Sequence, residues 1–249
     1  MADAGPTGLT GRTCVALALL AATAWLWVSW CSFPQELWND VRLAPAAAFV
    51  RGLPVYPTAG AGTINTWAYG PLPLLLLGPA TWAPGAGPAL QLAGAIVLLA
   101  VTLPIILVGW SWPRLAGLNL SPAGRLLAIV IVVGAWPRLG LQNIQADSFA
   151  VAFGLIGLFA LQHASNTTAR WIAATGAAAA VACKQTALGI AAAQLIWLGL
   201  TVGPREALRH AGRCAVVGAV LLGWATATFG GEALWFTMVT LPSRYPWDP

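Results

Sequence analysis

The sequence predicts an all-α polytopic membrane protein with about seven transmembrane helices and one interfacial or re-entrant helix. Two observations lead to this prediction. Hydrophobic residues make up 59% of the 249 residues and charged residues only 8%, whereas a soluble domain is about 25% charged. The hydrophobic residues also form continuous runs, which differ from the two-residue alternation of a membrane β-barrel. These features exclude a soluble globular enzyme and a disordered chain.

The first predicted span covers residues 13–32. Arg12 precedes this apolar run, as a basic residue precedes the apolar core of a signal peptide. The run is longer than the roughly 7–15 apolar residues of a signal peptide, and no convincing cleavage site follows it. We therefore expect a retained first helix whose N-terminus faces the cytoplasm.

The first outer loop is expected over residues 33–87. Within it, Arg42 to Arg51 predicts a short amphipathic helix on the bilayer surface, and 52–57 predicts a turn. Residues 70–82 are apolar, but they contain three prolines. As a helix they would rise only about 20 Å, less than a bilayer core of about 30 Å. This segment is therefore predicted to be interfacial or re-entrant, not a span.

Six further spans are predicted from the remaining apolar runs, at residues 88–110, 123–137, 147–163, 171–183, 186–202 and 214–230. The stretch 171–202 would measure about 48 Å as one helix, which is too long for one crossing. A hairpin that turns at Lys184 fits better, with its turn below the membrane surface. The whole chain, 1–249, is interpreted as one transmembrane domain with an outer tail at 231–249.

The distribution of basic residues favours this count, because cytoplasmic loops carry an excess of arginine and lysine. Seven spans place the following residues inside: Arg12, Arg114, Arg125, Arg170, Arg205, Arg209 and Arg213. They place these outside: Arg42, Arg51, Arg138, Lys184 and Arg244. If residues 70–82 crossed as well, the excess would fall on the outer side. The scattered basic residues form no nucleic-acid-binding patch, so no nucleic-acid partner is expected.

Three charged residues at the outer ends of predicted helices are the main candidates for chemistry. Asp40 follows the first span, Asp147 opens a later span, and Lys184, the only lysine of the chain, lies at the hairpin turn. A charge at membrane depth costs about 2.5–3.5 kcal/mol, so it marks a functional candidate. The structural alternatives are a helix N-cap for Asp147 and snorkelling to the interface for Lys184. Glu206 is expected to be solvated in a loop.

The order of short motifs resembles the polytopic glycosyltransferases of the GT-C fold, a family that includes protein O-mannosyltransferases and aminoarabinose transferases. An acidic residue in the first outer loop is followed by an interfacial helix, Gly-x-x-x-Tyr-Pro at 52–57 and Tyr-Gly-Pro-Leu at 69–72. Asn-x-Gln-x-Asp at 143–147 and Lys-Gln-Thr at 184–186 are similar to motifs of bacterial relatives. The similarity covers roughly residues 10–249 and corresponds to the N-terminal transmembrane module of that fold.

The resemblance implies that a sugar is transferred from a polyprenyl-phosphate donor to a lipid, glycan or protein acceptor. The reaction would take place on the outer face of a bacterial inner or plasma membrane. Asp40 would be the catalytic base, since the attacking hydroxyl must lose its proton. Lys184 would stabilise the leaving phosphate. The other expected substrate-binding residues are Asp147, Gln185, Asn143, Gln145, Arg42 and Tyr69.

Several alternatives stay open at this point. Asp40 and Asp147 could share a divalent cation, and no other cofactor is indicated. Many family members carry an Asp-Glu pair where this chain has Asn39-Asp40, and they usually continue with further spans. A non-catalytic or truncated fragment of the fold is one alternative. A transporter or flippase, with Asp147 and Lys184 as an intramembrane charge pair, is another, although no inverted repeat favours it.

Overall fold

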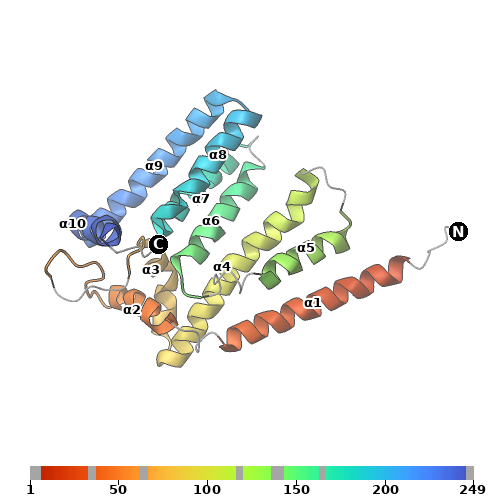
Figure 1. Cartoon of the computed structure of the whole chain (residues 1–249), viewed down its shortest axis with the longest axis horizontal. Helices are drawn as coiled ribbons and strands as arrows, with labels where there is room; N and C mark the ends of the chain where they lie inside the picture. The colour runs from red at the N-terminus through yellow and green to blue at the C-terminus, as the bar shows by residue number, and fades with distance from the viewer. Residues whose placement is uncertain are drawn as a thin grey trace.

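The structure, a computed structural model, describes residues 7–32, 38–61, 67–115, 120–135, 143–162 and 166–244. Within these ranges the chain is helical and contains no β-strand. The described residues include seven helices of at least 14 residues, which form the body of the molecule (Figure 1). They are α1 (Thr7–Ser32), α4 (Ala86–Leu115), α5 (Pro122–Ala135), α6 (Ala146–Leu161), α7 (Thr167–Cys183), α8 (Leu188–Thr201) and α9 (Pro204–Phe229).

The seven helices match the seven apolar runs in order, with one correction at the last of them. Helix α9 begins at Pro204, ten residues before the predicted start at 214. Its first turns carry Arg205, Glu206, Arg209 and Arg213, whose charges hide the helix from a search for apolar runs. Proline suits the first helical position, because its missing N–H has no intrahelical partner there.

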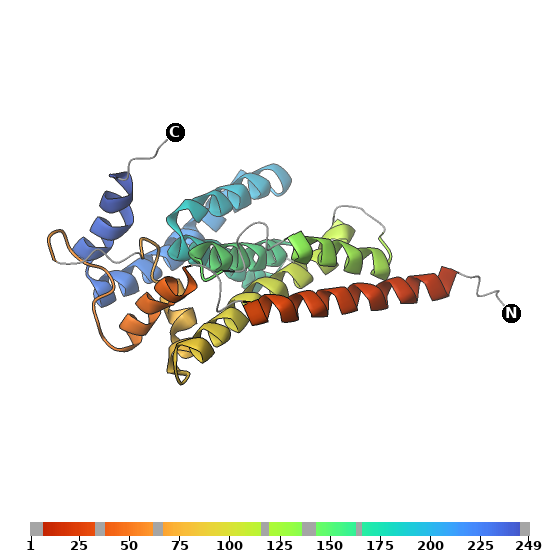
Figure 2. The same ribbon diagram turned by 60° about the horizontal axis from the view of Figure 1, so that its bottom comes forward.

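The predicted hairpin over 171–202 is confirmed. Helix α7 ends at Cys183 and α8 begins at Leu188, with a 3-10 turn at Gln185–Ala187 between them. Helices α6 to α9 run alternately up and down, while α1 lies along one side, against α4 and α5 (Figures 1 and 2).

Helices α6 and α7 approach each other closely through glycine and alanine. A Cβ atom placed on Gly176 would lie 2.7 Å from the Phe153 carbonyl oxygen and 2.9 Å from the Gly157 Cα. Ala173 and Ala177, on the same part of α7, are fully buried. Such small residues let two helix backbones come into direct contact, as is common where helices pack inside membranes.

The shorter elements gather at one end of the molecule, which we call the loop end (Figure 1). They are α2 (Asn39–Val50), α3 (Leu72–Leu77), the 3-10 helix η2 (Gly78–Trp82), α10 (Gly231–Trp235), a π-helical turn (Phe236–Thr240) and α11 (Leu241–Ser243). Helices α6 and α8 begin, and α7 and α9 end, at this end. Segments that the sequence predicts on one side of a membrane therefore share one end of the fold. The predicted tail 231–249 is helical over its described part.

Two helices in the described part of the chain, Ala86–Ser111 and Pro204–Phe229, are long and apolar enough to cross a membrane. The segments Leu72–Trp82, Pro122–Val133, Ala146–Leu161 and Gln185–Thr201 are apolar but shorter. The all-helical prediction is thus confirmed, together with two helices of membrane-spanning length. The number of spans stays a prediction.

Candidate functional site

Asp147 and Lys184 form an ion pair at the loop end. Lys184 Nζ donates a hydrogen bond of 2.6 Å to Asp147 Oδ1. The Lys184 side chain is 25% exposed and the Asp147 side chain is 31% exposed. Lys184 Nζ also lies 5.4 Å from the centre of the Tyr69 ring, within the range of a cation–π contact. Three of the predicted site residues are therefore brought together, and the pair remains accessible to a ligand.

The local backbone explains where the two charges lie. Helix α7 ends at Cys183, and Lys184 has an extended backbone, with φ −148° and ψ 123°. Helix α6 begins at Ala146, so Gln145 holds the N-cap position, without a side-chain cap. Asp147 lies in the first turn, where the helix dipole favours a negative charge. The N-cap alternative for Asp147 is therefore wrong, because Gln145 holds the N-cap position and Asp147 lies within the helix.

Gln185 ties three segments together. Its Nε2 donates to the carbonyl oxygens of Ala68, at 3.2 Å, and of Met238, at 3.0 Å. The side-chain amide of Gln185, which was expected to bind substrate, is therefore already hydrogen-bonded to the backbone. We assign Gln185 a positioning role, since it holds the first outer loop and the C-terminal helices against the α7–α8 turn.

Gly70 brings the Tyr-Gly-Pro segment into direct backbone contact with the end of α7. Its N–H donates to the Cys183 carbonyl oxygen at 3.0 Å. A Cβ atom at this position would overlap the Ala182 carbonyl oxygen. Only glycine allows this approach, which places Tyr69 beside Lys184.

Two further hydrogen bonds fix the backbone on either side of the Tyr69 ring. The Tyr56 hydroxyl donates to the Tyr69 carbonyl oxygen at 2.8 Å, and Trp67 Nε1 donates to the Gly70 carbonyl oxygen at 3.1 Å. Burial raises the pKa of the Tyr56 hydroxyl above its usual range, so this group remains a neutral donor. The Trp67 ring packs edge-on against Tyr69, with their ring planes at 85°.

Asn39 joins two segments that are distant in the chain, a role that was not predicted from the sequence. It is fully buried, and its Oδ1 accepts a hydrogen bond of 2.9 Å from the Ile144 N–H. This bond attaches the start of α2 to the 143–147 segment, 105 residues away. In the sequence, the one feature that could have pointed to this role is an asparagine followed by an aspartate just ahead of a predicted helix.

Asp40 faces another part of the surface. It is exposed, and its Oδ1 accepts from the Val41 N–H at 2.8 Å. It lines a cavity of about 320 Å³ between α2, η2 and the start of α4, together with Arg51 and Thr81. Neither Asp147 nor Lys184 lines this cavity, so the structure does not bring Asp40 into one cavity with the other two charged candidates.

The remaining predicted residues lie on α2 or on the segment that Asn39 anchors. Arg42 is half-buried on α2. The main-chain carbonyl oxygen of Asn143 accepts a hydrogen bond from Ser148 Oγ at 3.4 Å. The side-chain Oδ1 of Asn143 is buried and has no hydrogen-bond partner among the described residues. Gln145 has an extended backbone before α6. Asn143 and Gln145 thus flank Ile144, the residue bound to Asn39.

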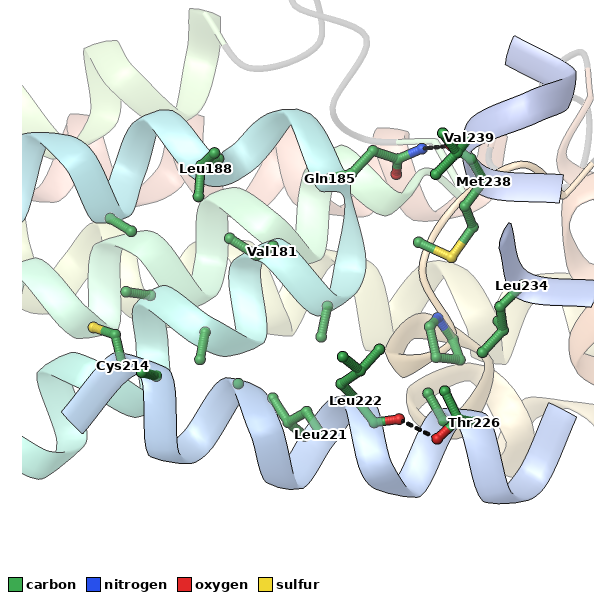
Figure 3. A pocket seen from close by; sticks show the side chains of 18 of the residues that line it. Val181, Gln185, Leu188, Cys214, Leu221, Leu222, Thr226, Leu234, Met238 and Val239 are labelled. Atoms are coloured by element: carbon green, nitrogen blue, oxygen red, sulfur yellow. Dashed lines mark hydrogen bonds between the residues drawn. The ribbon is translucent and has the colours of Figure 1, made fainter. Parts of the chain in front are cut away.

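An apolar groove of about 630 Å³ lies between α7, α8, α9 and the α10 region (Figure 3). Its walls carry Val181, Leu221, Leu222 and Leu234, among others, with few polar atoms. It reaches Gln185 at the loop end, next to Lys184, and extends along α9 to Cys214. From Thr226 to Cys214 the groove follows α9 for about 18 Å.

Glu206 contradicts the expectation of a solvated loop residue. It lies in the first turn of α9, its side chain is 9% exposed, and it accepts a hydrogen bond of 2.8 Å from Arg213. Arg170, from α7, lies 3.3 Å away. The predicted span began only at residue 214, so the sequence did not place Glu206 on one helix with Arg213, and Arg170 is distant in the chain.

Within the described ranges, no three His, Cys, Asp or Glu side chains gather to hold a metal ion. Comparison with protein-family models, with curated proteins and with solved structures finds no match for this chain. A function must therefore be inferred from the site itself.

Proposed function

We propose that the chain is a multi-pass protein of a bacterial inner or plasma membrane, with seven spans and a cytoplasmic N-terminus. The alternating directions of α6 to α9 and the two helices of spanning length support this. The shorter helices of 14–17 residues rise about 21–26 Å. They cross a bilayer core of about 30 Å with help from flanking residues and local thinning.

We further propose that the protein transfers a sugar from a polyprenyl-phosphate donor, as a GT-C-like glycosyltransferase. The observation that carries this proposal is the apolar groove that reaches Gln185, the residue that follows the chain's only lysine. A polyprenyl phosphate likewise combines a long apolar chain, which suits the groove, with an anionic end, which suits the lysine. The isoprenoid chain fits the groove, and the phosphate then lies at Lys184, where charge-assisted hydrogen bonds are strong.

The acceptor is assigned to the Asp40 cavity. Its hydroxyl oxygen attacks the anomeric carbon of the donor, and Asp40 takes the hydroxyl proton. The bond between the anomeric carbon and the phosphate oxygen breaks, and polyprenyl phosphate leaves. Lys184 stabilises the charge that grows on this phosphate. The Asn39 hydrogen bond supports the assignment, because Asn39 directly precedes Asp40 and is bound to Ile144, in the segment that leads to Asp147.

Binding of a polyprenyl phosphate in mixed micelles tests the donor site. Lys184→Gln should weaken binding about 10- to 150-fold, the equivalent of losing a charged hydrogen bond of about 1.5–3 kcal/mol. Lys184→Arg should retain part of the affinity, since it keeps the charge but changes the geometry. Arg244→Gln is the matched control, because Arg244 is exposed and loses the same charge. Equal affinity of Lys184→Gln and wild type would reject the phosphate site.

Release of sugar from a polyprenyl-phosphate sugar tests the chemistry without an identified acceptor, since water can take the acceptor's place. Asp40→Asn should lower this release at least about 100-fold, the usual contribution of a general base. Donor binding should stay unchanged, because Asp40 lines a different cavity from the groove. Wild-type turnover by Asp40→Asn would reject its role as the base.

A flippase is the second candidate function. The Asp147–Lys184 pair favours it, since a neutral pair at membrane depth is also what a transport path uses. Proteoliposomes distinguish the candidates. A flippase moves a labelled polyprenyl phosphate between leaflets without releasing sugar, whereas a transferase releases sugar.

A further inference from the structure

A cluster of three arginines surrounds Glu206 at the end of the molecule opposite the loop end. Arg213 Nη1 lies 2.8 Å from Glu206 Oε1, and Arg170 Nη1 lies 3.3 Å from Glu206 Oε2. Arg209 Nη1 lies 3.6 Å from Glu206 Oε2. One carboxylate therefore faces three guanidinium groups, and the cluster keeps a net charge of +2.

Two helices assemble this cluster, which we call the arginine cluster (Arg170, Arg209 and Arg213, with Glu206). Helices α7 and α9 both begin at this end of the molecule (Figure 1). Glu206, Arg209 and Arg213 share one face of α9, because their spacing of three and four residues follows the helical repeat. The Arg213 side chain points back toward the start of α9, as helical side chains do, and so reaches Glu206.

The packing behind the cluster holds it in place. His210, on the same face of α9, is fully buried, and its Nε2 lies 2.9 Å from Gln194 Oε1 on α8. The Glu206 side chain is 9% exposed and Arg213 is 15% exposed. Arg209, in contrast, is 69% exposed. Its distance to Glu206 is too long for a hydrogen bond, so a ligand can reach this guanidinium.

Exposed apolar side chains lie beside the charges. Leu208, next to Arg209 in the chain, is 73% exposed, and Leu200, at the end of α8, is 83% exposed. Arginine next to exposed leucine matches a ligand with an anionic head and apolar tails. A free phosphate ion would use the arginines but not the leucines.

We propose that the arginine cluster binds the headgroup phosphate of an anionic phospholipid in the cytoplasmic leaflet. Glu206 holds Arg170 and Arg213 in position, and Arg209 donates to the lipid phosphate. The acyl chains pack beside Leu200 and Leu208. The inference rests on the membrane embedding in the proposed function, but it does not depend on sugar transfer.

The test measures thermal unfolding of the full chain in detergent micelles, titrated with phosphatidylglycerol, phosphatidylcholine or inorganic phosphate. Phosphatidylglycerol should raise the Tm of the wild type more than the other two additives. Arg209→Gln should weaken phosphatidylglycerol binding about fivefold, the effect of one arginine near a membrane surface. Arg244→Gln removes the same charge at the loop end and should leave binding unchanged.

Glu206→Gln separates a built site from plain charge attraction. It raises the net charge of the cluster to +3, so charge attraction alone would tighten lipid binding. The proposed site predicts weaker binding, because Arg170 and Arg213 lose the carboxylate that holds their positive charges beside Arg209 and the lipid phosphate. Should this variant not fold, the comparison of Arg209→Gln with Arg244→Gln decides.

Four results would overturn the lipid site. Inorganic phosphate could reproduce the full shift, phosphatidylcholine could match phosphatidylglycerol, Arg209→Gln and Arg244→Gln could behave alike, or a folded Glu206→Gln variant could bind phosphatidylglycerol more tightly than the wild type. None of these results bears on polyprenyl phosphate binding at Lys184, so failure of this inference and failure of the proposed transferase are distinguishable.

Discussion

Lys184 lies between two residues that are each held by the backbone of other segments. The Cys183 carbonyl oxygen binds Gly70, and Gln185 binds Ala68 and Met238. The backbone of Lys184 is therefore fixed, while its side chain retains several partners. Asp147 and the Tyr69 ring are two of them, and we infer that a donor phosphate is a third.

Asp147 should compete with such a phosphate for the lysine. Asp147→Asn removes a negative charge close to the proposed phosphate, and this repulsion is worth about 1 kcal/mol at 4 Å even in water. We therefore expect Asp147→Asn to bind polyprenyl phosphate at least about fivefold more tightly than wild type. The measurement is the same micelle titration. Weaker binding would mean that Asp147 positions Lys184 for the ligand instead of competing with it.

At the scale of helices, apolar runs predicted most of the fold. They identified all seven longer helices, and the length of 171–202 predicted the α7–α8 hairpin. They failed at the start of α9, because charged residues there pair with each other and with α7. Hydropathy counts such charges as solvated, and a single sequence does not reveal that Arg170 and Glu206 meet.

Contact between α6 and α7 depends on the absence of a side chain at Gly176. Gly176→Ala should destabilise the protein by about 1–3 kcal/mol, since the added Cβ would press on the Phe153 carbonyl oxygen and the Gly157 backbone. The control is Gly223→Ala in α9, where nothing lies within 4 Å of the added atom. That variant should be stabilised by about 0.5–1 kcal/mol, the usual gain from alanine within a helix. Denaturant unfolding in micelles measures both, and equal effects would contradict this account of the helix contact.

At the scale of the whole molecule, the two ends differ in charge and in structure. One end carries the arginine cluster at the starts of α7 and α9, and the other carries the loops, Asp40 and the Asp147–Lys184 pair. The sequence predicted this division from the positive-inside bias. It did not predict the two separate cavities, because these depend on which side chains α2 and α10 bring against the longer helices.

The division predicts which end faces the cytoplasm. In a chain whose native cysteines are replaced, Ala59→Cys should react with an impermeant thiol reagent in intact cells or spheroplasts. Val202→Cys, exposed at the opposite end, should react only after the membrane is ruptured. The reverse pattern, or labelling of both without rupture, would contradict the proposed topology.

The contact between residues 68–70 and residues 183–185 depends mainly on main-chain atoms, apart from the Gln185 amide. Replacement of Ala68 or Cys183 by another residue would leave these hydrogen bonds possible, because both residues contribute only their carbonyl oxygens to them. An insertion or deletion of one residue would instead shift every donor past its acceptor. Related chains that share this fold should therefore keep Gly70 and an amide donor at Gln185, while the spacing from Ala68 to Gly70 and from Cys183 to Gln185 stays constant.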